Sequence, residues 1–442
     1  RASIRIKFYC NDNDVARNSE NYVAAKIWLS LFEETMREIV YMGEQAGLQT
    51  HFDFSIEGPE LNIFGFSDSM KNWVPEVIKR IYNFTITDDL MDSFQNCFEA
   101  QKKKIENYPL IKPYSQTLDG LKLNILSPSI DNFDLINHIN NVTIDTLREF
   151  GENWLKKAHH EWLVVANFTA DDVKEIVQKS EEAMTSTPLS RDDLLQFRVV
   201  KLPKGVSSSS KELSNPQEAN SAILLYFQHS DTDLRSTLNI EVLAQYLSEP
   251  FFNQLRTIEQ LGYLVYTFKQ EIRGYCGLSC LIQSSVGNPQ YLAERIHIFF
   301  DDIWKKVENL SDQEFKKIVN AVITMKRQKP LKLSEEAKDY WIEITNKQYI
   351  FDRKKKEVEI LESLTKTEFI ALYKSLLLDE AHVISLERIC KSHVDGECKK
   401  PSKDMKGDIV IANHKQFITT RALYPDLYNC DPNRYNTHSD AQ

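Results

Sequence analysis

Two side chains in the segment 248–266, SEPFFNQLRTIEQLGYLVY, could bind a peptide backbone. Arg256 stays charged and carries several N–H donors, whereas Tyr263 is neutral near pH 7 and donates one O–H. Both kinds of donor suit carbonyl oxygens. The alternative interpretation is structural: Arg256 would be a solvated residue paired with Glu259 one turn on, and Tyr263 would serve packing.

The first part of this segment predicts a helix. We expect Pro250 in its first turn, where the missing N–H of proline does no harm. Phe251, Leu255 and Ile258 follow at helical spacing and form an apolar stripe. Arg256 then points away from that stripe, toward solvent or a ligand.

The helix is expected to end at Gly262, which can take a positive φ, and Tyr263 then opens an alternating strand. The serine-rich stretch 202–220 is predicted to be a domain boundary or an exposed edge strand. Hydrophobic periodicity predicts the remaining elements of the first half of the chain. The expected strands are 3–10, 48–56, 60–66 and 161–168, with Gly58-Pro59 at the hairpin turn, and the expected helices are 21–47, 69–84, 88–107, 114–126, 143–156 and 170–184.

The pattern of the first half returns in the second half, at a separation that drifts by only a few residues. The matches, in the same order, are 8–14 with 227–233, 44–48 with 259–263, Phe94 and Pro109 with Phe315 and Pro330, Thr143 and Leu147 with Thr365 and Phe369, and Ala158-His159 with Ala381-His382. We therefore predict an α+β fold of two homologous domains, 1–197 and 198–442. Each is expected to be an antiparallel β-sheet with helices packed mainly on one face.

The repeat also bears on the candidate pair. At the positions of Arg256 and Tyr263 the first repeat has Tyr41 and Leu48. The shared fold therefore does not require an arginine and a tyrosine there, which favours a functional role for the pair. The two residues 259–260 have counterparts in both copies and are interpreted as structural residues at a helix end.

The composition and charge of the chain favour some classes of protein function over others. The chain has 442 residues and a net charge of −10, which does not indicate a nucleic-acid-binding protein. No apolar run approaches the roughly 20 residues of a membrane span. Seven scattered cysteines are typical of reduced thiols in a cytoplasmic protein. Because the sequence begins at Arg1 and shows no signal peptide, we expect a fragment or a processed chain.

Other catalytic motifs are missing from the sequence. It contains neither His-Glu-x-x-His nor the inverted His-x-x-Glu-His, the spacings that place two imidazoles and a carboxylate around zinc. His159-His160 is interpreted as a surface and core pair on a strand. Cys390, His393 and Cys398 lie close together but lack tetrahedral ligand spacing, so we expect no metal there. The chain offers no evident nucleophile or general base.

Four stretches of the sequence resemble one family. SEPFFNQLRTIEQLGYLV at 248–265, KPLKLSEEAKDYWIEI at 329–344, KQYIFDR at 347–353 and the closing residues 413–425 resemble the C-terminal half of the insulin-degrading enzyme (pitrilysin/insulinase) family of inverted-zincin metallopeptidases. A weaker likeness continues back to 44–48, so the resemblance covers essentially the whole chain.

The resemblance implies a division of labour. Family members have two halves, each of two homologous domains, that close around a chamber. The zinc motif lies in the N-terminal half, so the resemblance implies Zn²⁺ in that partner half, no metal in this chain, and no activity of this chain alone. Arg256 and Tyr263 fall on the family's residues that hydrogen-bond the substrate backbone, and Asn253 is a further candidate for lining the chamber.

The resemblance also implies partners and alternatives. The partners would be the N-terminal catalytic half, in the same polypeptide or another chain, short peptide substrates, and a second copy in a homodimer. The compartment would be the cytoplasm, with the mitochondrion as the alternative. Relatives of the same fold act as non-catalytic subunits of mitochondrial processing peptidase or of a respiratory complex. A structural or substrate-binding subunit and a pseudoenzyme therefore remain open.

Overall fold

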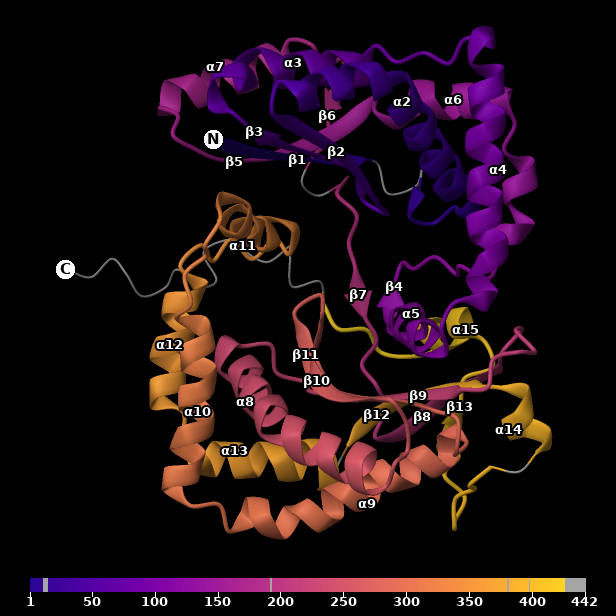
Figure 1. Cartoon of the computed structure of the whole chain (residues 1–442), viewed down its shortest axis with the longest axis vertical. Coiled ribbons are helices and arrows are strands. Elements are labelled where there is room, and N and C mark those ends of the chain that lie inside the picture. The colour runs from indigo at the N-terminus through magenta and orange to yellow at the C-terminus, as the bar shows by residue number, and fades with distance from the viewer. Residues whose placement is uncertain (11–14, 191–192, 380, 397, 426–442) are drawn as a thin grey trace.

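Two mixed sheets, each dominated by antiparallel pairing, form the framework of the chain in a computed structural model (Figure 1). The structure describes residues 1–10, 15–190, 193–379, 381–396 and 398–425. The first sheet has the order β2 (Leu48–Ser55), β3 (Gly58–Gly65), β1 (Ala2–Cys10), β5 (Lys157–Ala166) and β6 (Thr187–Pro188). The second has the order β10 (Leu264–Ile272), β11 (Tyr275–Ser284), β9 (Ser221–Gln228), β12 (His382–Ile389), β8 (Gly205–Glu212) and β13 (Ile409–Val410).

The two sheets share one arrangement of strands. The order β2-β3-β1-β5 in the first matches β10-β11-β9-β12 in the second, and all neighbours in both series are antiparallel. Parallel pairing occurs where β6 joins β5, and where β12, β8 and β13 meet. The predicted α+β class is confirmed. The boundary at 197/198 stays a prediction.

Helices from the first half cover one face of the first sheet. They are α2 (Ser19–Gln45), α3 (Ser67–Tyr82), α6 (Ile144–Trp154) and α7 (Ala170–Glu181), while α4 (Met91–Asn107) packs against α2 and runs past the sheet toward the second half (Figure 1). The long α2 begins at Asn18, whose side chain accepts hydrogen bonds from two backbone N–H groups of the first turn. Its buried stripe brings Trp28 and Phe32 against Trp154 and Phe84, an edge-to-face and stacked aromatic cluster.

A second layer covers one face of the second sheet. It consists of α8 (Leu234–Phe251) and α9 (Pro289–Glu308), and α10 (Asp312–Lys326), α12 (Arg353–Ser363) and α13 (Lys366–Tyr373) pack against α8. Phe251, the last residue of α8, is fully buried and meets Phe299 of α9 edge-to-face at 5.3 Å. The C-terminal end of α8 is therefore anchored in the core, which fixes the segment that follows it.

The two halves exchange one helix each. α5 (Pro113–Ile125) packs against β9 and β12 of the second sheet, and α11 (Leu333–Thr345) packs against β1 and β5 of the first (Figure 1). Leu121 and Ile125 join a buried cluster with Leu224 and Leu386. Each sheet thus has its main helical layer on one face and a helix from the other half of the chain on the opposite face. The prediction of helices mainly on one face of each sheet is therefore correct for the main layers, and the helix on the opposite face was not predicted.

The turns of the two equivalent hairpins also meet. Glu57 lies in the β2–β3 turn and Arg273 in the β10–β11 turn, with Nη2 of Arg273 3.3 Å from Oε2 of Glu57. Nζ of Lys347 lies 3.7 Å from the other carboxylate oxygen, and Lys7 adds a third nearby cation. Burial raises the pKa of Glu57, but Arg273, Lys7 and Lys347 outweigh it and hold the pKa below its usual value.

Most predicted elements are confirmed to within a few residues at their ends. One difference is the hairpin turn: Ser55 pairs with Gly58, so the turn is formed by 56–57, and Gly58 with φ of 136° already belongs to β3. The other is the serine-rich stretch. Part of it forms β8, where β13 pairs with the outer side at Ser207 and Ser208 and residues 210–212 are exposed, so the expected exposed edge is found only at the end of the strand. Ser207 is fully buried there.

Candidate active-site corner

The helix before the candidate pair starts earlier than the sequence predicts. α8 begins after Asp233, whose side chain accepts a hydrogen bond from the Ser236 N–H, so Pro250 lies near the C-terminal end of the helix and not in its first turn. A proline inside a helix removes one backbone hydrogen bond and clashes with the preceding turn. Two residues after Pro250 the regular helix gives way to a π-helix, η6 (Phe252–Ile258).

The π-helix changes which side chains share a face. Its hydrogen bonds span five residues, as in the 3.0 Å bond from the Glu259 N–H to the Gln254 carbonyl. Phe251 and Leu255 are buried as predicted, but Ile258 is 62% exposed because the wider turn takes it off the apolar stripe. The predicted stripe is therefore wrong at its last residue.

The chain reverses at Gln260, not at Gly262. Gln260 has a φ of 54°, and the next N–H, of Leu261, bonds to the Leu255 carbonyl at 3.0 Å, which closes the end of the π-helix. Gly262 is needed for another reason, because a Cβ there would lie 2.0 Å from the Gln283 carbonyl oxygen of β11. The glycine permits a close backbone approach, and β10 begins two residues later, one residue after Tyr263.

Arg256 and Tyr263 come together at this corner. The guanidinium of Arg256 lies 4.6 Å from the ring centre of Tyr263 and 4.6 Å from that of Phe252, so it is held between two aromatic rings. The Tyr263 side chain is 83% exposed. In the part of the chain that the structure describes, no carboxylate pairs with Arg256. The N–H groups at its edge are therefore available to a ligand.

The structural alternative predicted that Arg256 pairs with Glu259, and this prediction is wrong. Glu259 accepts two hydrogen bonds from Arg295 of α9, at 2.7 and 2.8 Å, and one from Gln254 at 2.9 Å. Burial raises the pKa of Glu259, but the hydrogen bonds from Arg295 and Gln254 outweigh it and lower the pKa. Asn253 is exposed on the same π-helix. No sequence signal pointed to Arg295, and Phe252 was visible only as part of the segment.

The adjacent histidines of β5 point to opposite faces of the sheet, as expected for neighbours on a strand. His159 packs beside Tyr9 and His160 beside Phe8. Both are half-buried, so the predicted division into one surface and one core residue is wrong. Burial lowers the pKa of His160 to about 4, and its Nε2 lies 2.8 Å from the Tyr82 hydroxyl. His160 is therefore neutral near pH 7.

The Cys390 region is a buried hydrogen-bond network. His393 Nδ1 lies 2.7 Å from the Ser221 hydroxyl, and its Nε2 lies 3.1 Å from the Ser285 carbonyl, which occupies both ring nitrogens. Cys390 Sγ lies 3.4 Å from the same hydroxyl oxygen. Across the described ranges, no group of three histidine, cysteine, aspartate or glutamate side chains could hold a metal ion.

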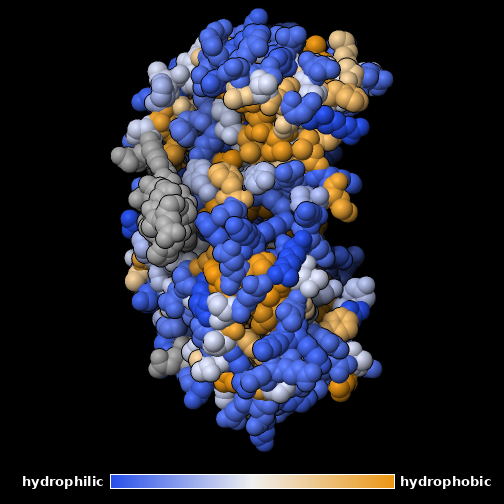
Figure 2. Space-filling model, turned by 90° about the vertical axis from the view of Figure 1, so that its left-hand side faces the viewer, coloured by the Kyte–Doolittle hydropathy of each residue, from blue (hydrophilic) through white to orange (hydrophobic). Residues whose placement is uncertain are grey.

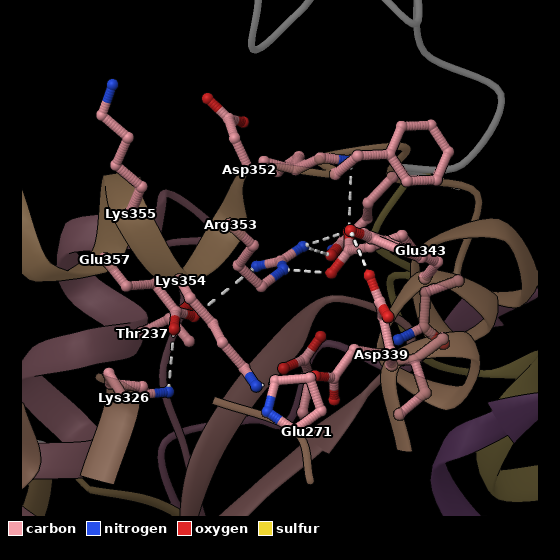
Figure 3. Close-up of a pocket in the computed structure, with 18 of the residues that line it drawn as sticks. Thr237, Glu271, Lys326, Asp339, Glu343, Asp352, Arg353, Lys354, Lys355 and Glu357 are labelled. Atoms are coloured by element: carbon pink, nitrogen blue, oxygen red, sulfur yellow. Dashed lines mark hydrogen bonds and ion pairs between the residues drawn. The ribbon is translucent and has the colours of Figure 1, made fainter. Parts of the chain in front are cut away.

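A pocket of about 450 Å³ lies between α11, α12 and β10 (Figure 3). Its charged walls pair with one another: Arg353 with Glu343, and Lys326 with Glu357 at 2.9 Å. Figure 2 shows the face that carries α11 and α12, where apolar patches lie among charged residues. Sequence reasoning did not find this pocket, because residues from 237 to 357 meet in it only after folding.

Comparison with known proteins places these observations in a family. Residues 1–138 match the profile of the middle or third domain of peptidase M16, and residues 242–341 match that of the C-terminal lobe domain 4 of PQQ synthase PqqF-like proteins. The chain belongs to the insulinase (M16) family of peptidases. Insulin-degrading enzyme from Homo sapiens is 31% identical over 380 residues, which cover 83% of this chain and 36% of that protein. The putative zinc protease mug138 of Schizosaccharomyces pombe is 26% identical over 98% of this chain and 44% of its own length.

The fold agrees with this membership. The crystal structure of pitrilysin superposes with a TM-score of 0.83 and 19% identity, over 96% of this chain and 44% of pitrilysin. A peptidase M16 inactive domain from Pseudomonas fluorescens superposes with a TM-score of 0.66 and 12% identity, over 91% of this chain and 94% of that chain. This chain thus spans less than half the length of human insulin-degrading enzyme and of mug138. No helix among its described residues has the length and apolarity to cross a membrane.

Proposed function

We propose that this chain is the C-terminal half of a zinc metalloendopeptidase that degrades short peptides. In this proposal it forms part of the wall of a closed chamber and binds the substrate backbone through Arg256 and Tyr263. The observation that carries the proposal is the corner itself. A guanidinium held between two aromatic rings, with no carboxylate partner in the described part of the chain, stands beside an exposed phenol.

The arrangement suits the binding of carbonyl oxygens. The aromatic rings restrict the rotamers of Arg256 before a substrate arrives, which lowers the entropy lost on binding. The N–H groups at the edge of the guanidinium and the hydroxyl of Tyr263 can then donate to two successive peptide oxygens. Donors fixed in advance in a site that closes against water stabilise developing negative charge more strongly than donors in solution.

The metal of the proposed enzyme belongs to the partner half. The described residues of this chain gather no set of zinc ligands, and mug138 and human insulin-degrading enzyme are each more than twice as long as their matched portion. An N-terminal catalytic half, in the same polypeptide or on another chain, would therefore supply the zinc. Closure of the two halves would bring the corner of Arg256 to the scissile bond.

The equal strand order of the two sheets supports a duplicated domain, with 1–197 and 198–442 as the two copies. Asn253, exposed on η6, is proposed to line the chamber. A homodimer and a cytoplasmic location, with the mitochondrion as the alternative, complete the proposal. All cysteines in the described ranges are free thiols, which agrees with a reducing compartment.

A second candidate function is a non-catalytic subunit of the same fold. It is favoured by the superposition on a peptidase M16 inactive domain, which this chain covers almost from end to end. In that case the chain would bind or enclose peptides without cutting them. Arg256 and the exposed Tyr263 would then be expected to matter for peptide affinity and not for turnover.

Cleavage of a quenched fluorescent peptide of about ten residues separates these candidates. The chain is assayed alone and together with its N-terminal half, each with and without a zinc chelator. The proposal predicts no activity alone and chelator-sensitive activity on recombination, which falls by about 10²–10³ in Arg256→Ala. Activity of the pure chain, or peptide binding without cleavage by the recombined protein, would contradict it.

A further inference from the structure

The carboxylate nearest to Arg256 along the chain is held by another arginine. Arg256 and Glu259 are three residues apart, a spacing at which opposite charges on an ordinary helix pair readily. Here the π-helix places Glu259 over Gln254, five residues earlier, with a side-chain hydrogen bond of 2.9 Å. The backbone follows the same five-residue spacing, from the Glu259 N–H to the Gln254 carbonyl.

Arg295 completes this arrangement from α9. Its Nε and Nη2 donate to the two oxygens of Glu259 at 2.7 and 2.8 Å, a bidentate pair that engages both oxygens of the carboxylate. The side chains are only 14% exposed for Glu259 and 25% exposed for Arg295, so solvent screens the pair weakly. Gln254 takes a further lone pair on one of the same oxygens. Glu259 thus has little capacity left for a second cation.

We propose that Arg295 is a positioning residue that keeps Arg256 free for substrate by occupying Glu259. The π-helix turns Glu259 away from Arg256, and Arg295 holds it there. Without Arg295, a largely buried carboxylate would lack its main partner, and the cations that could replace it are Lys399, which already acts on Glu259, and the guanidinium of Arg256 three residues away. Arg256 would then leave the rings of Phe252 and Tyr263, and its N–H groups would bond to Glu259 and no longer be available to substrate.

This inference rests on the proposed function, because it gives Arg295 the role of keeping a substrate-binding arginine unpaired. It differs from a structural role for Arg295 in one respect. If the pair is merely structural, Arg256 stays in place when Arg295 is lost, and neutralising the remaining buried carboxylate can relieve the damage in that case too. Sequestration alone predicts that Arg256 pairs with Glu259 when Arg295 is removed and is released when Glu259 becomes neutral.

The activity test uses three variants in the recombined two-half protein. Arg295→Met keeps the apolar stem of the side chain and removes its charge. We expect it to lower kcat/KM by about tenfold or more, a fraction of the 10²–10³ expected for loss of one transition-state donor. The double variant Arg295→Met/Glu259→Gln is expected to recover to within about threefold of Glu259→Gln alone. Arg327→Met, in an exposed pair with Glu362, is the matched control and should leave kcat/KM unchanged.

A second readout does not depend on activity. In protein labelled with ¹⁵N-arginine, the hydrogen exchange of the Arg256 Nε–H with water is measured by NMR. Pairing with Glu259 should slow this exchange in Arg295→Met and restore it in the double variant. Unchanged exchange in Arg295→Met, or activity that stays low in the double variant, would overturn the inference. If Arg256→Ala has no effect on activity, the proposed function fails, while the exchange measurement still decides whether Arg295 prevents the pairing.

Discussion

The two sheets present equivalent corners that differ in their local geometry. In the first corner, α2 ends as an ordinary helix at Gln45, and Gly47 with φ of 79° leads into β2, whose first residue Leu48 is buried. In the second corner, 252–264, a π-helix follows α8 and Gln260 takes the positive φ. The first corner uses glycine where the backbone needs it, and the second does not.

This difference shows where the second copy departs from what folding alone requires. Both corners connect a helix to the edge strand of a hairpin, so the first corner shows that a regular helix end is sufficient. A π-helix and a non-glycine residue at positive φ each raise the energy of the folded state, and such features gather at functional sites. In the second corner they place Arg256 against Tyr263 and turn Glu259 away.

The largest expected effect comes from disrupting the contact between the two equivalent hairpin turns. Glu57→Gln removes the carboxylate that Arg273, Lys347 and Lys7 share, and Lys347 and Lys7 stay buried. We expect the free energy of unfolding to fall by about 3–5 kcal/mol, as for a buried ion pair that loses one partner. Urea denaturation of the chain measures it. Glu76→Gln, in an exposed helical pair with Arg80, should change stability by less than about 1 kcal/mol.

The lowered pKa of Glu57 also predicts that the junction between the two hairpin turns loses stability at low pH. Because the folded-state pKa of Glu57 is lowered, its contribution to stability is complete above the unfolded pKa and is lost as pH falls through the folded pKa. Urea midpoints between pH 7 and pH 3 should therefore decline less steeply for Glu57→Gln than for the unmodified chain. Parallel slopes would mean that Glu57 does not sense the three cations.

The next prediction compares the glycines of the two corners. Gly262→Ala would place a Cβ 2.0 Å from a backbone carbonyl of β11, so β10 must move. Gly47→Ala would meet the Phe66 ring, a side chain that can turn, although its positive φ adds strain. We expect Gly262→Ala to destabilise the chain by about 1–3 kcal/mol and also to lower peptide cleavage, since Tyr263 precedes β10. Thermal unfolding and the cleavage assay test this, and retained activity in Gly262→Ala would contradict it.

The smallest expected effect concerns Gln260. Glycine adopts a positive φ without the Cβ clash, so Gln260→Gly should relieve strain at the end of the π-helix. The greater freedom of glycine in the unfolded chain offsets part of this gain. We expect a net stabilisation of about 0.5 kcal/mol, measured by urea denaturation. A clear destabilisation would show that the Gln260 side chain makes a contact that the first corner does not need.

Sequence reasoning reached the elements and the pair but not their geometry. Periodicity located α2 and the hairpin of β2 and β3, because amphipathic patterns follow directly from one buried face. Pattern also brought Arg256 and Tyr263 to one corner. It placed the chain reversal at Gly262, because glycine is the usual residue at positive φ, and the close approach of β11 that explains this glycine is a tertiary contact.

The other features that the sequence did not predict also depend on the folded structure. The exchange of α5 and α11 between the sheets could not be predicted, since an apolar helix face does not say which sheet it will cover. The π-helix makes the spacing of Ile258 misleading, because the periodicity of an α-helix no longer applies. Arg295 lies in another helix, and only the folded structure brings it to Glu259.

The central claim is that the second corner acts on substrate while the first corner is only scaffold. The most direct test is kcat/KM for peptide cleavage by the recombined two-half protein carrying Arg256→Ala, Tyr263→Phe or Tyr41→Phe. Tyr41 is the exposed residue of the first corner at the position of Arg256. We expect a loss of about 10²–10³ for Arg256→Ala, a clear loss for Tyr263→Phe and no change for Tyr41→Phe. Equal activity in all three variants would contradict the claim.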